Sequence, residues 1–435
     1  MEIIIAGAGR VGFRLAQALS EKHNVILIDS NEVALEKIQE SIDVLTICGN
    51  VEDPKSYKTL VDKDIDIFVA VTDADETNLI ASIIASEKIN VKQKIIRLKQ
   101  EFFAKSSIAQ KIGITDAVFP YNQTAKGIIS LLNYPKANNV KSFPNTKNKL
   151  ISIRIDNDHH ELSIFKIDSK KVKVVGIDSG KRLYIPNGDE KLHSGNMAYL
   201  FGDEKEIEKI AFKLNSSMPK KIKNIAIFGA DILGIEIAKA LIENGANVKI
   251  IEKDLKKCNF ASEVLQNKAT IINSKYGDFR LYNDEGLKNA DMIIASTSND
   301  EENIIKCIEA KAQGVQKVIA INNDIEYYKL MHTLGVIVVR GPKTNAFYSI
   351  MEIIGSNKVV NEKLFCGGSG ISFLKDVEVN KQIQPLNIQG VITYLIQNEE
   401  FEIFHSKKTV DSSGQIVTFA MIEKEEEVRR WINKL

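Results

Sequence analysis

Three glycines close to the amino terminus constrain the fold of this chain more than any other feature. Gly7, Gly9 and Gly12 have the spacing G-x-G-x-x-G and directly follow the apolar run Ile3–Ala6, which is typical of a parallel strand buried on both faces. Apolar residues then recur at four-residue intervals, as they do on one face of a helix. This order of strand, glycines and helix is the beginning of a dinucleotide-binding β-α-β unit.

The same stretch ends in an acidic residue. The apolar run Val25–Ile28 is followed by Asp29, whose carboxylate can accept hydrogen bonds from a ribose diol and would repel a 2′-phosphate. In such a unit Gly7 permits the tight turn, Gly9 lets the backbone approach a pyrophosphate, and Gly12 lets the helix pack close to the strand. Free N–H groups at the helix N-terminus favour phosphate. We therefore predict a bound adenosine nucleotide; the alternative is a Rossmann-type scaffold with an empty site.

The composition excludes several classes of protein. A chain of 435 residues is expected to contain several domains, and 58 Lys+Arg against 57 Asp+Glu gives a net charge of +1, which offers no electrostatic argument for binding nucleic acid or an anionic membrane. No apolar segment is long enough to span a bilayer, and because Met1 leads directly into the first strand we expect no signal peptide. The four cysteines are scattered without a C-x-x-C pair, so we expect no disulfides, no zinc and a cytoplasmic location.

Residues 222–342 repeat the pattern of the first unit at a nearly constant offset. The corresponding positions are Gly7 and Gly229, Gly12 and Gly234, Asp29 and Glu252, Gly49-Asn50 and Gly277-Asp278, Asp75 and Asp300, and Pro120 and Pro342. An offset that holds across a whole unit indicates a duplicated domain.

A smaller module follows each copy. Leu150–Leu214 and Ile371–Leu435 each contain short alternating strands and a charged helix, and the polar stretch Lys136–Lys149 is interpreted as a linker. The predicted fold is α/β: two Rossmann-like, doubly wound parallel sheets, each followed by a small α+β module. The predicted boundaries are 1–135, 136–217, 218–355 and 356–435.

This arrangement resembles the RCK/KTN family (regulators of K+ conductance), in particular its Trk-type potassium-uptake regulatory subunits, in which each of two nucleotide-binding RCK-N domains precedes a small RCK-C module. The resemblance covers essentially the whole chain. It rests on GAGRVG at Gly7–Gly12, AVTDADETN at Ala70–Asn78, IIRLKQEF at Ile95–Phe102 and VVGIDSGKRLYIPNGDEKLHSGN at Val174–Asn196. In the small modules, Gly195-Asn196 and Gly414-Gln415 replace the usual Gly-Asp.

The resemblance implies a non-enzymatic cytoplasmic subunit at the inner face of the plasma membrane. It would bind NAD(H) or ATP/ADP, form a homo-oligomer (a dimer, or a tetramer forming a ring), and gate a Trk-type membrane potassium transporter subunit. The implied phosphate-binding residues are Gly7, Gly9, Arg10, Val11 and Gly12, with Asp29 on the ribose, Asn50 near the base, and Thr72, Asp73 and Arg97 near the phosphates or the second half of the nucleotide. Guanidinium suits this role because it can meet phosphate oxygens bidentately; alternatively, Arg97 pairs with Asp73 or Asp75.

Two apolar helices are predicted at Ala125–Leu132 and Ala346–Ile354. In the family the equivalent helix crosses to a neighbouring domain and makes a dimer. The alternative is ordinary packing on the parent domain.

The second copy departs from the nucleotide-binding pattern at two places. Asp231 replaces the middle glycine and adds negative charge where a pyrophosphate would lie, and Val318–Asn323 contains no counterpart of Arg97. We therefore predict that the site containing Gly229, Gly234 and Glu252 binds nucleotide weakly or not at all. Tyr121 and Lys343 stand where relatives often have Glu, so no cation site is predicted.

Catalytic motifs are not found in the sequence. No Tyr-x-x-x-Lys, H-E-x-x-H, G-x-S-x-G or Walker A pattern occurs, and the pair His159-His160 is interpreted as a solvated turn and not as a metal site. Two alternatives to the regulatory subunit remain: an NAD(P)-dependent oxidoreductase of unusual architecture, and a regulator of a K+/H+ antiporter or another cation transporter.

Overall fold

The computed structural model describes residues 1–100, 102–103, 106–156, 163–180, 182–186, 188, 190–324, 326–355, 360–404 and 406–435. His159 and His160 lie outside these ranges. The chain divides into two compact units, one formed by Met1–Ala125 with Arg340–Gly355 and the other by Lys126–Val339 with Ser356–Leu435.

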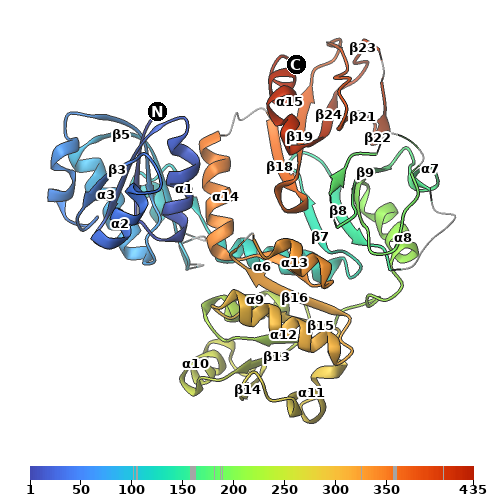
Figure 1. The fold of residues 1–435 in the computed structure, drawn as a ribbon, viewed down its shortest axis with the longest axis horizontal. Helices are drawn as coiled ribbons and strands as arrows, with labels where there is room; N and C mark the ends of the chain where they lie inside the picture. The colour runs from blue at the N-terminus through green and yellow to red at the C-terminus, as the bar shows by residue number, and fades with distance from the viewer. Residues whose placement is uncertain are drawn as a thin grey trace. The chain divides into compact units, whose positions relative to one another are not determined.

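The first unit contains a six-stranded parallel sheet of order β3-β2-β1-β4-β5-β6 (Figure 1). Its strands are β1 (Glu2–Ala6), β2 (Asn24–Asp29), β3 (Leu45–Cys48), β4 (Asp64–Ala70), β5 (Asn90–Arg97) and β6 (Asp116–Val118). Its helices are α1 (Arg10–Ser20), α2 (Glu32–Gln39), the 3-10 helix η1 (Pro54–Leu60), α3 (Asp75–Lys88) and α5 (Ile108–Lys111), and α6 (Pro120–Asn133) begins here. The order confirms a doubly wound Rossmann-like sheet, with its topological switch between β1 and β4.

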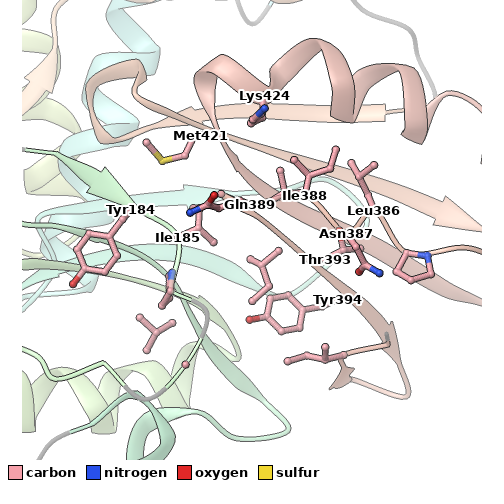
Figure 2. Close-up of a pocket in the computed structure, with 18 of the residues that line it drawn as sticks. Tyr184, Ile185, Leu386, Asn387, Ile388, Gln389, Thr393, Tyr394, Met421 and Lys424 are labelled. Carbon is pink, nitrogen blue, oxygen red and sulfur yellow. The ribbon is translucent and has the colours of Figure 1, made fainter. Parts of the chain in front are cut away.

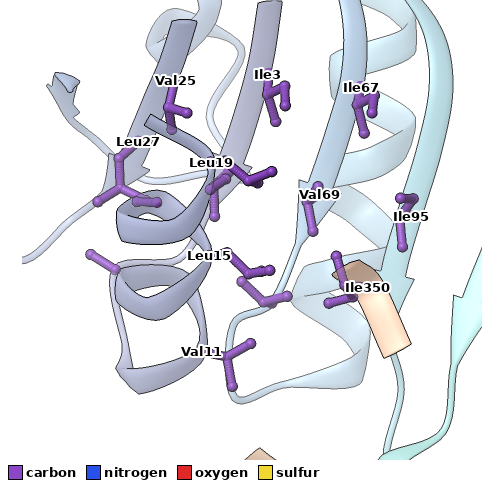
Figure 3. Packing of buried hydrophobic residues seen from close by; sticks show 14 of the residues in the cluster. Ile3, Val11, Leu15, Leu19, Val25, Leu27, Ile67, Val69, Ile95 and Ile350 are labelled. Atoms are coloured by element: carbon purple, nitrogen blue, oxygen red, sulfur yellow. The ribbon is translucent and has the colours of Figure 1, made fainter. Parts of the chain in front are cut away.

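The helix α14 (Pro342–Gly355) completes the core of this first unit, although it follows the second Rossmann domain in the sequence. Figure 3 shows Ile350 of α14 beside Leu15 and Val69, and Figure 1 shows α14 alongside α1. Ile350 is fully buried, and the Arg14 guanidinium lies 4.4 Å from the centre of the Phe347 ring. Of the two alternatives for this helix, the structure therefore shows the crossing and not packing on the parent domain.

The second unit contains the second Rossmann-like sheet, of order β14-β13-β12-β15-β16-β17, which repeats the first. Its strands are β12 (Asn224–Phe228), β13 (Asn247–Glu252), β14 (Thr270–Asn273), β15 (Met292–Ala295), β16 (Lys317–Asn322) and β17 (Ile337–Arg340). Its helices are α9 (Ile232–Glu243), α10 (Leu255–Leu265), α11 (Arg280–Asp284), η2 (Leu287–Asn289), α12 (Asp300–Ala312) and α13 (Tyr328–Thr333).

The two small modules in this unit are antiparallel sheets of order β10-β9-β11-β8-β7 and β18-β19-β24-β21-β22. The first has β7 (Asn139–Ser142), β8 (Lys149–Arg154), β9 (Val172–Asp178), β10 (Leu183–Tyr184), β11 (Met197–Gly202), α7 (Ile164–Ile167) and α8 (Glu204–Leu214). The second has β18 (Val360–Phe365), η3 (Cys366–Gly368), β19 (Gly370–Val377), β20 (Gln382–Ile383), β21 (Val391–Gln397), β22 (Glu400–Glu402), β23 (Lys408–Thr409), β24 (Gly414–Met421), η4 (Ile422–Lys424) and α15 (Glu425–Ile432). The interpretation of Lys136–Lys149 as a linker is wrong, because β7 lies within it and pairs with β8.

The two small modules share one hydrophobic core. The Phe201 ring packs against Phe401 and Phe419, with ring centres 5.5 Å and 5.1 Å apart. Beside this core lies a cleft of about 1090 Å³ with a mixed polar and apolar lining, formed from one module by Tyr184 and Ile185 and from the other by Leu386–Tyr394 (Figure 2).

Candidate nucleotide-binding site

The predicted site residues of the first copy follow the carboxyl ends of its parallel strands. In register, Ala6 of β1 pairs with Ile28 of β2 and Ala70 of β4, and Ala70 pairs with Ile96 of β5. Each strand therefore ends at the same edge of the sheet, just before Gly7, Asp29, Val71-Thr72 and Arg97. Open α/β sheets bind ligands in the crevice at such a switch point.

The glycine turn has the geometry that phosphate binding requires. Gly7 has φ +113°, and a Cβ on it would lie 3.1 Å from the backbone nitrogen of Thr72. A Cβ on Gly12 would lie 1.8 Å from the carbonyl oxygen of Gly7, so only glycine allows α1 to begin this close to β1. A Cβ on Gly9 would have no described atom within 4 Å, which leaves open space at the N-cap of α1.

The first turn of α1 is available to an anion. No described side chain caps this N-terminus, and its first turn carries no acidic residue. Arg10 is exposed there, whereas Val11 is 3% exposed and packs into the core, so Val11 can offer a ligand only its backbone. Unpaired N–H groups and the helix dipole both favour a phosphate at such a position.

Asp29 and Asn50 stand at the ends of β2 and β3. The Asp29 carboxylate accepts hydrogen bonds from the backbone N–H of Ala8 at 2.6 Å and of Asn31 at 2.8 Å. Each carboxylate oxygen can accept a further bond, so Asp29 keeps capacity for a ribose diol. Asn50 is exposed, and its Oδ1 accepts from the backbone N–H of Glu52.

Arg97 is a buried cation with few partners. It is 3% exposed, and its Nη1 lies 3.4 Å from Oδ1 of Asp73, whose side chain is 84% exposed. Its Nε has no hydrogen-bond partner among the described residues. Asp75, the other partner considered, instead accepts the backbone N–H groups of Lys99 and Gln100. A single long contact to an exposed carboxylate is weak, so the guanidinium retains capacity for another acceptor.

Asn78 joins Thr72 to Arg97, and sequence reasoning did not include it in the site. Asn78 is 1% exposed; its Oδ1 accepts from the Thr72 backbone N–H at 2.9 Å and hydroxyl at 2.7 Å. Its Nδ2 donates to the carbonyl oxygens of Thr72 at 3.1 Å and Arg97 at 2.8 Å. A polar residue in a helix is ordinarily solvated, so the residue pattern offered no reason to expect Asn78 to be buried. The one available signal was its place at the end of the stretch AVTDADETN.

The structure corrects one correspondence between the two copies. Glu252 pairs with Asn273 as Asp29 pairs with Cys48, and Ser274 donates to the Glu252 carbonyl as Gly49 donates to the Asp29 carbonyl. Ser274-Lys275, and not Gly277-Asp278, therefore matches Gly49-Asn50. Asp278 instead matches Asp53, because each accepts the N–H two residues ahead at the start of a short helix.

The second copy keeps the turn, but its own side chains use the groups that a nucleotide would need. Gly229 has φ +105°, and a Cβ on Gly234 would lie 2.1 Å from the Gly229 carbonyl oxygen, as in the first copy. Asp231 occupies the N-cap of α9 and forms an ion pair of 2.5 Å with Lys257.

Glu252, the counterpart of Asp29, is 2% exposed. It accepts hydrogen bonds from the backbone of Ala230 at 2.8 Å and of Asp254 at 2.9 Å, and from the Tyr276 hydroxyl at 2.9 Å. Burial alone would raise the pKa of Glu252, but these hydrogen bonds outweigh it and the pKa is lowered. The carboxylate is thus charged and already well satisfied.

Two other kinds of feature are absent from the described part of the chain. It contains no helix with the length and apolar character needed to cross a membrane. It also contains no cluster of three or more His, Cys, Asp or Glu side chains suited to a metal ion.

Comparison with known proteins finds relatives over the whole chain. The TrkA-N domain model matches residues 3–120 and 225–342. A Trk system potassium uptake protein TrkA homolog of Archaeoglobus fulgidus is 26% identical over 451 residues, covering 99% of this chain and 100% of the relative. The Trk system potassium uptake protein TrkA of Halomonas elongata is 23% identical, covering 97% and 96%.

Solved structures with the same fold include the GsuK RCK domain, with a TM-score of 0.65 and 13% identity over 100% of this chain and 95% of that one. The GsuK channel bound to NAD has a TM-score of 0.64 and 12% identity, covering 100% of this chain and 79% of that one. These likenesses show the RCK-type fold.

Proposed function

Because the chain belongs to the TrkA-N domain family, we propose that it is the nucleotide-sensing regulatory subunit of a Trk-type potassium uptake system. Its full-length similarity to TrkA proteins supports the assignment to potassium uptake. The observation that carries the sensing role is the first crevice, where an uncapped helix N-terminus lies beside a carboxylate with free acceptor capacity.

The proposed ligand of this crevice is NAD(H), ATP or ADP. Its phosphates meet the turn from Gly7 to Gly12, including the exposed Arg10, and its adenosine ribose bonds to Asp29. Asn50 lies near the base, and Thr72, Asp73 and Arg97 lie beside the remainder of the nucleotide. The GsuK channel has been solved with NAD and with ADP, which makes these two nucleotides the first to test.

The second crevice is proposed to be empty or weakly binding. A pyrophosphate there would meet the Asp231 carboxylate, and a ribose would have to displace the Tyr276 hydroxyl from Glu252. The second Rossmann domain then serves as a scaffold for the first.

The proposed mechanism is a shift between two conformations of an assembly. The subunit associates as a homo-oligomer with a membrane potassium transporter on its cytoplasmic side, and nucleotide changes gating only by the difference in its affinity for the two conformations. This role is non-enzymatic. A steady decrease of NADH with carbonyl substrates would favour the alternative of an NAD(P)-dependent oxidoreductase. Co-purification with an antiporter would favour the alternative of an antiporter regulator.

The test is a calorimetric titration of the full chain with NAD, NADH, ATP and ADP. Asp29→Ala is compared with Glu252→Ala, which removes the corresponding carboxylate from the second copy. We expect one site per chain, at least tenfold weaker binding in Asp29→Ala, and unchanged binding in Glu252→Ala. Unchanged affinities in Asp29→Ala would show that the site is wrongly assigned, and two tight sites per chain would refute the scaffold role.

A further inference from the structure

A buried asparagine makes the same four hydrogen bonds in both Rossmann domains, and we call this arrangement the asparagine clamp. Asn303 accepts hydrogen bonds from the Thr297 backbone N–H at 2.9 Å and hydroxyl at 2.8 Å, and it donates to the carbonyl oxygens of Thr297 at 3.1 Å and Ile321 at 2.9 Å. Asn78 makes the corresponding four bonds to Thr72 and Arg97. Both asparagines are buried, so each clamp fixes the loop after one strand to the end of the next.

The two clamps hold different strand ends. In the first copy the clamped strand β5 ends in Arg97, whose Nε has no partner among the described residues. In the second copy the clamped carbonyl belongs to Ile321, an apolar residue that is 1% exposed, so no cation stands at this position of β16. Only the first clamp therefore positions a buried cation with unused hydrogen-bonding capacity. A role in stability alone would not require such a cation at the first clamp and none at the second.

We propose that Asn78 is a positioning residue for the ligand of the first crevice. It places the Thr72 hydroxyl and the Arg97 guanidinium to meet the part of a nucleotide that extends beyond the first phosphate. The ligand class is therefore a dinucleotide or a nucleoside di- or triphosphate, and not a nucleoside monophosphate. This inference rests on the proposed function of the crevice.

The strand order supplies the geometric argument. The sheet places β2, β1, β4 and β5 side by side, and neighbouring strands lie about 4.8 Å apart, so the ends of β2 and β5 are separated by roughly 14 Å. A ribose at Asp29 and one phosphate at the glycine turn occupy the ends of β2 and β1. The end of β4, with Thr72, lies next to the glycine turn, but only a longer ligand reaches the end of β5, where Arg97 is held.

The chemistry of the clamped groups agrees with an anionic or polar ligand group. A buried guanidinium is ordinarily fully hydrogen-bonded, and among the described residues its one ionic partner is the exposed Asp73. A phosphate or carbonyl oxygen would supply a further acceptor through a charge-assisted bond. The Thr72 hydroxyl donates to Asn78, which leaves its lone pairs free to accept from a hydroxyl or an amide N–H of the ligand.

The test compares NAD with AMP, which lacks everything beyond the first phosphate. Calorimetric titration of the full chain gives the ratio of the two affinities for the wild type, Asn78→Ala and the matched control Asn303→Ala. We expect Asn78→Ala to lower the affinity for NAD at least tenfold more than that for AMP. Asn303→Ala should change both affinities less than twofold while lowering the melting temperature as much as Asn78→Ala does.

Each other result contradicts the inference in a recognisable way. Equal losses for NAD and AMP in Asn78→Ala would mean that the residue only stabilises the domain, and unchanged NAD binding would mean that it positions nothing. If Asn78→Ala does not fold, Arg97→Gln removes the cation that Asn78 positions and should lower the affinity for NAD selectively. A wild type that binds none of NAD, NADH, ATP and ADP refutes the proposed function itself, which separates that failure from this one.

Discussion

Lys317 provides the sharpest test of how the second unit is held together. Its side chain is fully buried at the start of β16, and its Nζ donates to the carbonyl oxygens of Leu131 at 3.1 Å, Pro135 at 2.8 Å and Ala137 at 3.1 Å, with Tyr134 at 3.5 Å. These carbonyls belong to the last turn of α6 and the residues after it, where a helix leaves acceptors unpaired.

Replacing Lys317 by methionine keeps much of the volume and removes the donor. Each buried carbonyl left without a partner costs about 1–3 kcal/mol, and the loss is partly offset because a charge no longer has to be buried. We expect Lys317→Met to lower the free energy of unfolding by about 3 kcal/mol. The control Lys256→Met removes an exposed lysine from α10 and should change it by less than about 0.5 kcal/mol.

The effect should also depend on pH in a defined direction. Burial, with the charge of Lys136 as the second cause, lowers the pKa of Lys317 from 10.5 to about 7 in the folded chain. Between these values the unfolded chain binds the extra proton, so the stability of the wild type rises with pH, by up to about 1.4 kcal/mol per pH unit, and below pH 7 this dependence disappears. Lys317→Met lacks this titration.

The assay is urea unfolding followed by the fluorescence of Trp431, the single tryptophan, which lies in the second unit. Measurements at pH 6.5, 7.5 and 8.5 should show the gap between wild type and Lys317→Met widening above pH 7. A stability difference that stays constant would show that Lys317 does not titrate in this pH range. A variant as stable as the wild type would show that the hydrogen bonds from Lys317 to the carbonyls do not stabilise the fold.

Three further changes test other parts of the structure. Gly9→Asp reproduces the second copy in the first; like charges about 4 Å apart at an effective dielectric near 20 repel by roughly 4 kcal/mol, so calorimetry should show nucleotide binding about a thousandfold weaker at an unchanged melting temperature. Ile350→Ala should destabilise the first unit by about 2–5 kcal/mol in chemical denaturation followed by hydrogen exchange; protection of α1 equal to that of the wild type would argue against its contact with α14. Tyr276→Phe removes a hydroxyl bond to Glu252 and should cost about 1 kcal/mol in urea unfolding without creating nucleotide binding; a new binding site would mean that this hydroxyl alone blocks the crevice.

Local patterns were sufficient to predict the sheets and the glycine turn. The apolar run Ile3–Ala6 and the spacing from Gly7 to Gly12 are properties of adjacent residues, so the sequence alone predicts β1, the turn and α1. The duplication then predicts the second sheet, whose strand order matches the first. The edge strand β7 was missed because edge strands need not alternate clearly between polar and apolar residues.

Contacts between distant residues could not be predicted in this way. Lys317 precedes an apolar run and looks like an ordinary exposed lysine, because its four carbonyl partners lie about 180 residues earlier. Gly277-Asp278 resembles Gly49-Asn50 in residue type, whereas the register between strands decides which residues correspond. The clamp of Asn78 depends on the carbonyl of Arg97, which becomes visible only when β4 and β5 are paired.

The position of α14 has a practical consequence for anyone who divides this protein. A fragment that stops at Ala125 carries all six strands of the first sheet but lacks Ala346 and Ile350, which are both fully buried in its core. Such a fragment would expose to solvent the apolar surface that α14 covers, and it should aggregate. A fragment of the first unit that folds by itself needs residues 340–355 fused to its end or supplied as a separate peptide. Neither half of the sequence therefore forms a complete folding unit.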